Sequence, residues 1–240
     1  MKYILLAITI ITTLLTSCKK KEETSTPANA TSTPDPKTFI GVFISGTYTN
    51  NISGTTNIGY GATARFYNQP SSNIYGANEI NVNRLSVNNY TLTNNNMFVY
   101  ALISPPSNTN LTVDTWSVTG ASGIPSFSYT NNHSFPNCDD FNVIPDSVSK
   151  TAGYTFNISN VNNMTWGVIS FGVGSSAIGY TLSLGSNQIN ITPSQLSTMP
   201  IDTLGSINIQ LQNAVTTTIS GKNFRFIKEA QIIKRFKIIP

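Results

Sequence analysis

The densest group of chemically capable side chains lies between His133 and Asp140. His133 is the only imidazole of the chain, and Cys138 follows it by five positions. A cysteine nucleophile needs a base close to its sulfur and a third group that orients the base. No such third group accompanies the pair. We therefore interpret the histidine as a surface loop residue and the cysteine as a small, buried thiol.

The same stretch offers oxygen ligands of the kind that calcium binds. Asn137, Asp139, Asp140 and Asn142 supply amide and carboxylate oxygens. The stretch has neither the spacing of an EF-hand loop nor a glycine at its turn, so Asp139 and Asp140 are weak candidates. An Asx-rich junction between domains explains the composition equally simply. We expect no metal and no cofactor.

The other carboxylates do not form an obvious catalytic pair. Hydrolysis of a glycoside needs two acids that face one cleft. Glu79 is the lone acid of its segment, and Asp114 stands beside Trp116 without an evident partner. Motifs for redox, nucleotide or phosphoryl-transfer chemistry are also missing from the sequence. We therefore expect a protein that is not an enzyme.

Cys18 carries the strongest chemical signal because of the residues before it. Met1-Lys2 is followed by an apolar, uncharged run over residues 3–15, which is typical of an export signal. The run is shorter than the about 20 residues that a membrane-spanning helix needs. Leu15-Thr16-Ser17-Cys18 resembles the bacterial lipobox, in which the cysteine becomes the lipid-carrying N-terminus. The resemblance implies a cleaved signal peptide over residues 1–17 and a membrane anchor at Cys18.

A polar tether follows the predicted anchor. Residues 18–37 are rich in Thr, Ser, Pro, Lys and Glu, and such a composition buries too little apolar area to fold. Lys21, Glu22 and Glu23 resemble the surface-export signal of Bacteroidota lipoproteins, which implies an outer-membrane protein exposed at the cell surface. A solvated charge run without a receptor is the alternative, and it leaves the periplasmic face as the location.

The formal net charge of +4 is concentrated near the C-terminus. The basic residues of the last 20 positions face a single acid, Glu229; they are Lys222, Arg225, Lys228, Lys234, Arg235 and Lys237. We expect them on the wet face and edge of a final strand, where they deter edge-to-edge pairing. Contact with anionic lipid or acidic polysaccharide is the alternative. Nucleic acid is not an expected partner, because the chain has an export signal and no nucleic-acid module.

From residue 38 onward the chain alternates apolar and polar residues in short segments separated by turn residues. Period-two alternation predicts strands, and it lapses between His133 and Ile144. We predict an all-β fold with an N-terminal β-sandwich over residues 38–142. A C-terminal immunoglobulin-like β-sandwich is predicted over residues 143–240. Trp116 and Trp166 are both expected in the cores.

Two local elements can be predicted in more detail. Thr192-Pro193-Ser194-Gln195 matches a capping box with proline at the first helical position, which predicts a short helix. Leu196 and Met199 are expected to cover the core. Residues 229–239 fit either an amphipathic helix or a strand. Their β-branched content favours a strand, with a bulge near Glu229.

Several longer segments carry a family resemblance. They are residues 116–120, 124–128, 145–153 and 220–226. They resemble recurring segments of Bacteroidota lipoproteins of uncharacterised function, which implies a fold but no catalytic residues. Asp146-Ser147-Val148 and Asp202-Thr203-Leu204 are similar to the acceptor triplet of periplasmic O-glycosylation in that phylum. This similarity makes Ser147 and Thr203 candidate glycosylation sites.

Two functions are compatible with these features. The first is a lipid-anchored, non-catalytic envelope protein with a structural or adhesion role, which binds a partner protein. The second is a glycan-binding module of a surface polysaccharide-uptake system, with sugars stacked on Tyr48, Tyr60, Tyr67, Tyr75 and Trp116. Stacking needs exposed, coplanar rings, whereas the alternation of most of these aromatics with aliphatic residues predicts burial. We therefore expect the first function.

Overall fold

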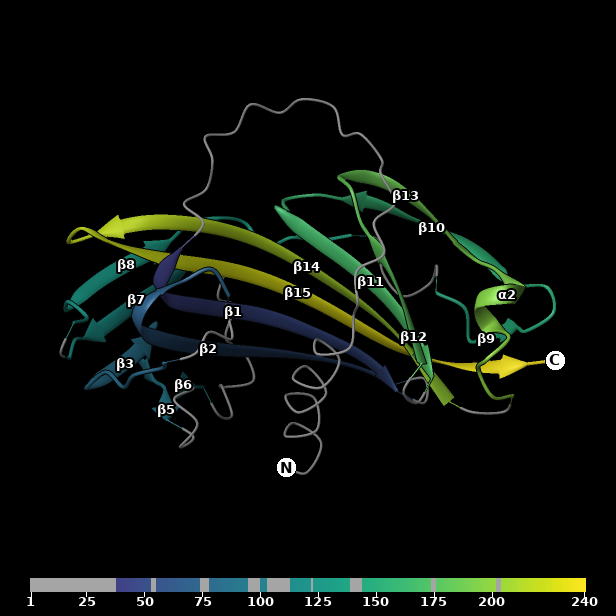
Figure 1. Cartoon of the computed structure of the whole chain (residues 1–240), viewed down its shortest axis with the longest axis horizontal. Coiled ribbons are helices and arrows are strands. Elements are labelled where there is room, and N and C mark those ends of the chain that lie inside the picture. The colour runs from purple at the N-terminus through teal and green to yellow at the C-terminus, as the bar shows by residue number, and fades with distance from the viewer. Residues whose placement is uncertain are drawn as a thin grey trace. The chain divides into compact units, whose positions relative to one another are not determined.

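The computed structural model describes residues 38–52, 55–73, 78–94, 100–102, 113–121, 123–138, 144–173, 176–201 and 204–240. They belong to a compact unit that extends from Pro34 to Pro240. This part of the chain consists mostly of β-strands, with one short helix (Figure 1). The prediction of a β protein is confirmed at this level. The predicted signal peptide and tether lie outside the described residues.

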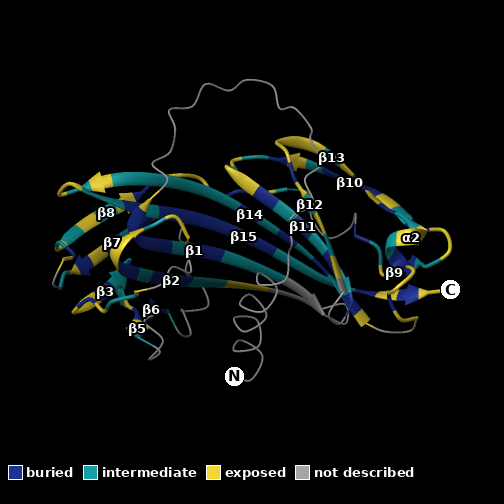
Figure 2. Ribbon diagram, in the orientation of Figure 1, coloured by how far each residue is buried: buried dark blue, intermediate teal, exposed yellow. Residues whose placement is uncertain are grey.

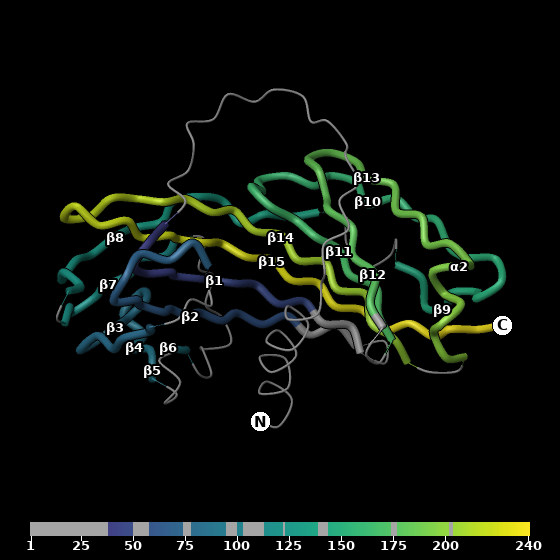
Figure 3. Tube along the Cα trace, viewed as in Figure 1, coloured from purple at the N-terminus to yellow at the C-terminus, as the bar shows by residue number. Residues whose placement is uncertain are grey.

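The largest sheet, here called the long sheet, contains nine of the described strands. Its order is β12-β11-β14-β15-β1-β2-β6-β5, with β9 paired to β15. The bounds are β1 Phe39–Ile52, β2 Thr55–Ser71, β5 Thr93–Asn94, β6 Tyr100–Ala101, β9 Ser147–Ser149, β11 Trp166–Val173, β12 Ser176–Thr181, β14 Leu204–Ile219 and β15 Lys222–Ile239. β15 is antiparallel to β14 and parallel to β1. The last of the described strands therefore runs beside the first of them (Figure 3).

A tight turn sets the register between β14 and β15. Ser220 and Gly221 form the two-residue connection and have φ angles of 51° and 75°. Two successive residues with positive φ are the signature of a type I′ hairpin turn, whose twist matches that of the flanking strands. Glycine adopts this conformation without steric cost.

The remaining strands form two smaller sheets. The four-stranded sheet has the order β4-β3-β7-β8, with β3 Arg84–Val87, β4 Tyr90–Thr91, β7 Asp114–Thr119 and β8 Phe127–Asn131. The two-stranded sheet pairs β10 Tyr154–Val161 with β13 Gly185–Ile191. The helix α2, Pro193–Leu196, has the predicted capping box between Thr192 and Gln195. Leu196 and Met199 are buried, as expected.

Side chains of β15 reach two hydrophobic cores. Phe224 and Phe226 belong to the first core, together with strands of the four-stranded sheet. Phe236 and Ile238 belong to the second core, together with β10 and β13. All four residues have even numbers in one uninterrupted strand, so they project from the same face of the long sheet. The buried stretch of β15 between them is visible in Figure 2.

The prediction of two tandem sandwiches, the second immunoglobulin-like, is not confirmed. The long sheet takes strands from both sides of the proposed boundary between residues 142 and 143. The physical reason is the parallel pairing of β1 with β15, in which Gly41 lies opposite Phe224. A Cβ atom on Gly41 would lie 2.8 Å from the Phe224 ring, so glycine permits this close approach. Alternation predicts strands, but it does not predict which strands pair.

The last segment is a strand, as expected, but it has no bulge near Glu229. The register of β15 with β14 is continuous from Lys222 to Lys237. β15 is also not an edge strand, so the expected edge position of its basic residues is wrong. The mixed periodicity has another cause, since Lys228, Glu229 and Gln231 are all buried. Both faces of the strand are covered there, and polar side chains occupy both.

Candidate functional site

A cluster of polar side chains, three of them buried and one half-buried, lies where the long sheet meets the four-stranded sheet. Asp114 begins β7, whereas Ser45, Tyr60 and Lys228 lie in β1, β2 and β15. Ser45 lies opposite Lys228 in the β1–β15 pair. Lys228 has the same parity as Phe226 and therefore projects from the same face of the strand. The fold thus places an acid and a base within one core.

Asp114 is the centre of this cluster. The Ser45 hydroxyl donates a hydrogen bond to its Oδ2 atom, and the Tyr60 hydroxyl donates to Oδ1 over 3.3 Å. The Lys228 Nζ atom lies 3.7 Å from Oδ2, and both side chains are 0% exposed. Each carboxylate oxygen therefore has at least one donor or cation beside it.

Burial shifts the proton equilibria of the cluster. Desolvation raises the pKa of the Asp114 carboxyl above its ordinary value, although Ser45 and Lys228 oppose this shift. Desolvation lowers the pKa of the Lys228 amine, and the charge of Asp114 opposes it. The pKa of Tyr60 is also raised, first by burial and then by Asp114. Burial therefore shifts the equilibria of Asp114 and Lys228 towards their neutral forms, while the contact between the two groups opposes the shift.

Two further residues complete the surroundings of the pair. The Phe135 ring centroid lies 4.6 Å from Lys228 Nζ, which is a cation–π distance. Asn131 lies opposite Asp114 in the β7–β8 pair and is buried. Its Oδ1 accepts a hydrogen bond from the His133 backbone N–H over 3.2 Å. Its Nδ2 is buried without a hydrogen-bond acceptor among the described residues.

A second buried acid projects from the opposite face of β15. Glu229 is the next residue after Lys228, so the two side chains leave the strand on opposite sides. Its Oε2 accepts hydrogen bonds from the Nε2 atoms of Gln210 and Gln212, both over 2.8 Å. Burial raises the pKa of the Glu229 carboxyl, and the two glutamine bonds only reduce that shift.

We expect Glu229→Gln to stabilise the protein at neutral pH. A raised pKa means that the folded state binds this proton more tightly than the unfolded chain. The free energy of unfolding therefore falls as the pH rises from the ordinary value of 4.5 through the raised pKa. Each pKa unit by which the folded state exceeds the unfolded state changes the free energy of unfolding by about 1.4 kcal/mol. Urea titrations at several pH values should show a flatter profile for the variant.

The control for this prediction is Leu184→Gln, because the Leu184 side chain is 63% exposed. It introduces the same amide at the surface without removing a titratable group, so it should retain the pH profile of the parent protein. An unchanged profile for Glu229→Gln would contradict the raised pKa.

A shallow groove of about 400 Å³ lies elsewhere, between β3 and β6. Amide side chains line it, among them Asn81, Asn83 and Asn94. The one aromatic residue among the described lining residues, Tyr100, is buried, and its hydroxyl is hydrogen-bonded to the backbone of Val82 over 2.7 and 2.8 Å. The described part of the groove therefore offers hydrogen-bonding groups for a polar ligand but no exposed ring for stacking.

Most residues singled out by their chemistry lie outside the described part of the chain. They are Cys18, Lys21, Glu22, Glu23, Asp139, Asp140 and Thr203. The lipid anchor, the export signal, the weak calcium site and one glycosylation site therefore stay predictions. Ser147 is described: it begins β9 and is exposed. Its exposure is what a glycosylation acceptor requires.

The expected roles of the remaining candidates can be compared with their surroundings. His133 is exposed, as expected for a surface residue. Cys138 is half-buried and packs against the second core. Glu79, the lone acid of its segment, forms an ion pair with Arg65. Asp114, for which the sequence suggested no partner, is paired with Lys228.

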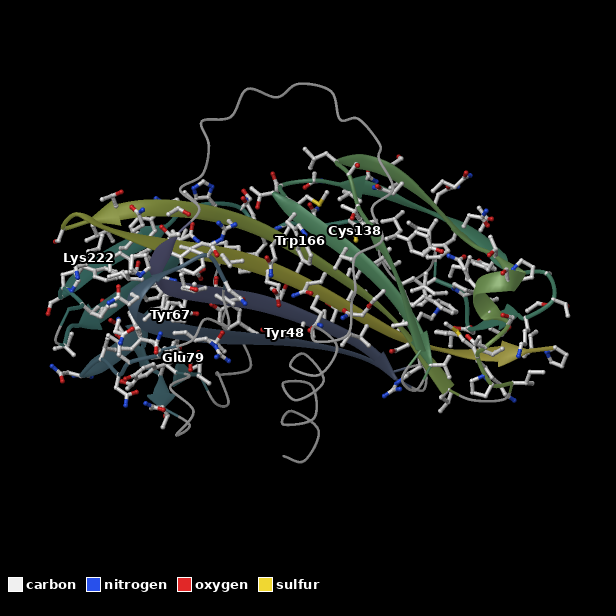
Figure 4. The ribbon with its side chains drawn as sticks, in the orientation of Figure 1. Tyr48, Tyr67, Glu79, Cys138, Trp166 and Lys222 are labelled. Carbon is white, nitrogen blue, oxygen red and sulfur yellow. The ribbon has the colours of Figure 1, made fainter. Side chains whose placement is uncertain are left out.

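The aromatic residues considered for sugar stacking are mostly enclosed. Trp116 and Tyr67 are each 1% exposed, and Tyr60 is half-buried with its hydroxyl bonded to Asp114. Tyr48 is half-buried and lies beside the backbone of Gly46 and Gly61 in the long sheet (Figure 4). Tyr75 lies outside the described residues. Trp166, which was expected in a core, is 42% exposed, so that prediction is wrong.

Ser45 and Lys228 are members of the buried site that the sequence does not point to directly. One signal is present: Lys228 follows Phe224 and Phe226 at period two, so the alternation that buries the phenylalanines also buries the lysine. The basic residues that dominate the segment favour a wet face instead, and for Lys228 that expectation is wrong. Nothing local in the sequence indicated Ser45.

Comparisons with known proteins add little to this description. No protein-family model matches the chain, and no curated protein is significantly similar to it. Among solved structures, a chain with some likeness belongs to a 1.5-MDa bacterial ice-binding adhesin studied for its retention at the host cell surface. The identity is 10% over 80% of this chain and 64% of the other, with a TM-score of 0.26. This chain thus spans less than two thirds of that chain, and a likeness so low carries no argument.

Within the described residues, no helix is both long and apolar enough to cross a bilayer. Their His, Cys, Asp and Glu side chains form no group of three or more that would hold a metal ion.

Proposed function

We propose that the protein is a lipid-anchored, non-catalytic surface protein of the bacterial envelope, with a structural or adhesion role. The observation that carries the proposal is the sequence around Cys18. A basic start, an apolar run over residues 3–15 and small residues directly before the cysteine occur in the order that lipid modification requires. Anchoring by acyl chains is durable, since each buried CH₂ contributes about 0.8 kcal/mol.

The described residues are compatible with a binding or structural role. The two acids considered for catalysis are engaged in pairs, Glu79 with Arg65 and Asp114 with Lys228. The long sheet rests on hydrophobic cores and buried polar contacts. A rigid β-structure of this kind, carried on a tether, presents its loops to a partner. The burial of Trp116 and Tyr67 gives the glycan-binding alternative less support.

Replacing Cys18 with serine tests the proposal. We expect Cys18→Ser to abolish incorporation of labelled palmitate and to move the protein from the membrane fraction to the soluble fraction, because the variant lacks the thiol that carries the lipid. Protease added to intact cells should degrade the parent protein if the anchor holds it on the outer face. Resistance to that protease would place it on the periplasmic face instead.

The matched control is Cys138→Ser. It removes the other cysteine of the chain and should leave palmitate labelling and fractionation unchanged. If Cys18→Ser kept its lipid label and its membrane association, the proposed anchor would be wrong.

A further inference from the structure

Lys228 and Asp114 are arranged for covalent chemistry as well as for ion pairing. The Lys228 amine lies 3.7 Å from a carboxyl oxygen of Asp114, and neither side chain is exposed. The two residues come from different sheets, β15 of the long sheet and β7 of the four-stranded sheet. They are 228 − 114 = 114 positions apart in the chain. The fold therefore holds an amine against a carboxyl group between two layers.

We propose that Lys228 and Asp114 form an intramolecular isopeptide bond, an amide that links the long sheet covalently to the four-stranded sheet. The uncharged Lys228 amine attacks Cγ of the protonated Asp114 carboxyl. The Nζ–Cγ bond forms and the Cγ–Oδ2 bond breaks. Oδ2 leaves as water with its own proton and one proton from Nζ. The reaction is a condensation, so it needs no oxidant, reductant or co-reactant. The modification is independent of the proposed lipid anchor.

The surroundings of the pair favour the reacting forms. Burial lowers the pKa of the lysine and raises the pKa of the aspartic acid, and proton transfer between them gives the neutral amine and the neutral acid. The Phe135 ring beside Nζ contributes to the apolar wall of the site. Fixed reactants can reach effective molarities of about 10⁵ to 10⁸ M. A buried site also keeps bulk water away from the amide, which protects it from hydrolysis.

Two hydroxyl groups are placed to assist the step. The Tyr60 hydroxyl donates to Oδ1, the oxygen on which negative charge develops when the amine attacks Cγ, so it acts as an oxyanion donor. The Ser45 hydroxyl contacts Oδ2, the leaving oxygen, and can relay the proton from Nζ to it. Each group therefore touches one of the two oxygens that change during the reaction.

Asn131 provides a competing acceptor that the experiment must distinguish. It lies opposite Asp114 in the β7–β8 pair, and its buried Nδ2 has no acceptor among the described residues. A bond from Lys228 to Asn131 would release ammonia instead of water. We favour Asp114 because its carboxyl contacts Nζ directly.

Mass spectrometry of the purified full-length protein tests the proposal. After denaturation and digestion with trypsin, unmodified chains release residues 226–228 and 229–234 as separate peptides. Trypsin does not cleave after a lysine whose amine is in an amide. We therefore expect a branched product that joins residues 85–150 to residues 226–234. Its mass should equal the summed masses of the peptides 85–150 and 226–234 minus the mass of one water molecule. Fragmentation should locate the link at Asp114 and Lys228.

Variants separate the chemistry from folding. Tyr60→Phe removes the donor to Oδ1, and we expect several-fold less branched product in freshly purified protein with an unchanged circular dichroism spectrum. Tyr180→Phe is the control, since the Tyr180 hydroxyl donates to the Asn190 carbonyl, away from the pair; it should leave the branched product at the parent level. Complete release of residues 226–228 from the parent protein would overturn the proposal. A link to Asn131 with loss of ammonia would overturn it as well.

Discussion

Lys228→Met is expected to lower the free energy of unfolding by about 3 to 5 kcal/mol relative to parent protein in which Lys228 and Asp114 are still a separate ion pair, which is the typical cost of removing one partner from a buried ion pair. The variant leaves the Asp114 carboxyl fully buried without its cation. Methionine has a similar length and fills most of the space of the lysine stem, so a cavity contributes little. Equilibrium unfolding in urea, followed by the fluorescence of the buried Trp116, measures the difference.

The double variant Asp114→Asn with Lys228→Met is the control for this prediction. It removes the uncompensated charge while keeping the size of both side chains, and we expect it to regain most of the lost stability. Neither variant has the Lys228 amine, so any contribution of the proposed isopeptide bond cancels between them. Equal stability of the single and double variants would show that the charge of Asp114 carries no penalty in the folded state.

Elements that depend on neighbouring residues were predicted well from the sequence. The short helix α2 begins where the capping box of Thr192 and Gln195 places it, because the contacts that start a helix lie within four residues. The final segment is a strand, as its β-branched content indicated. These predictions needed no information about distant parts of the chain.

Features that depend on distant residues could not be predicted in this way. The pairing of Gly41 with Phe224 joins the two ends of the described chain, and no local pattern records it. In β11, apolar residues occupy both the even-numbered and the odd-numbered positions. The sequence therefore does not indicate which face of this strand is buried. We assigned Trp166 to the core, but Ile169 and Phe171 of the opposite parity are buried instead. A neighbouring strand decides which of two apolar faces is covered.

The candidate site shows the same limit at the level of single residues. Asp114, Ser45 and Lys228 come from three strands that are far apart in the sequence, and each is unremarkable alone. Period two correctly places Lys228 in phase with Phe226. General experience that lysine is rarely fully buried argued against that placement. The paired carboxylate resolves the conflict, because a charged group is tolerated inside a protein when it has a partner.

Phe43→Ala is expected to destabilise the protein by about 3 to 5 kcal/mol, the usual range for removing a buried phenylalanine ring. Phe43 is 0% exposed and is the aromatic residue around which the first core is built. Its ring centroid lies 4.7 Å from that of Phe226, in a stacked arrangement, and 5.1 Å from that of Trp116, in an edge contact. It therefore links β1 to β15 in the long sheet and to β7 in the four-stranded sheet. Urea unfolding and the thermal midpoint measure the loss.

Ile58→Ala is the matched control, because Ile58 lies in the neighbouring strand β2 and is 78% exposed. A surface substitution of this kind typically changes stability by less than about 0.5 kcal/mol. If the two variants had similar effects, the first core would not hold the sheets together as described. A large loss for Phe43→Ala alone is the result expected if this ring helps to hold the long sheet against the four-stranded sheet, since it contacts residues of both.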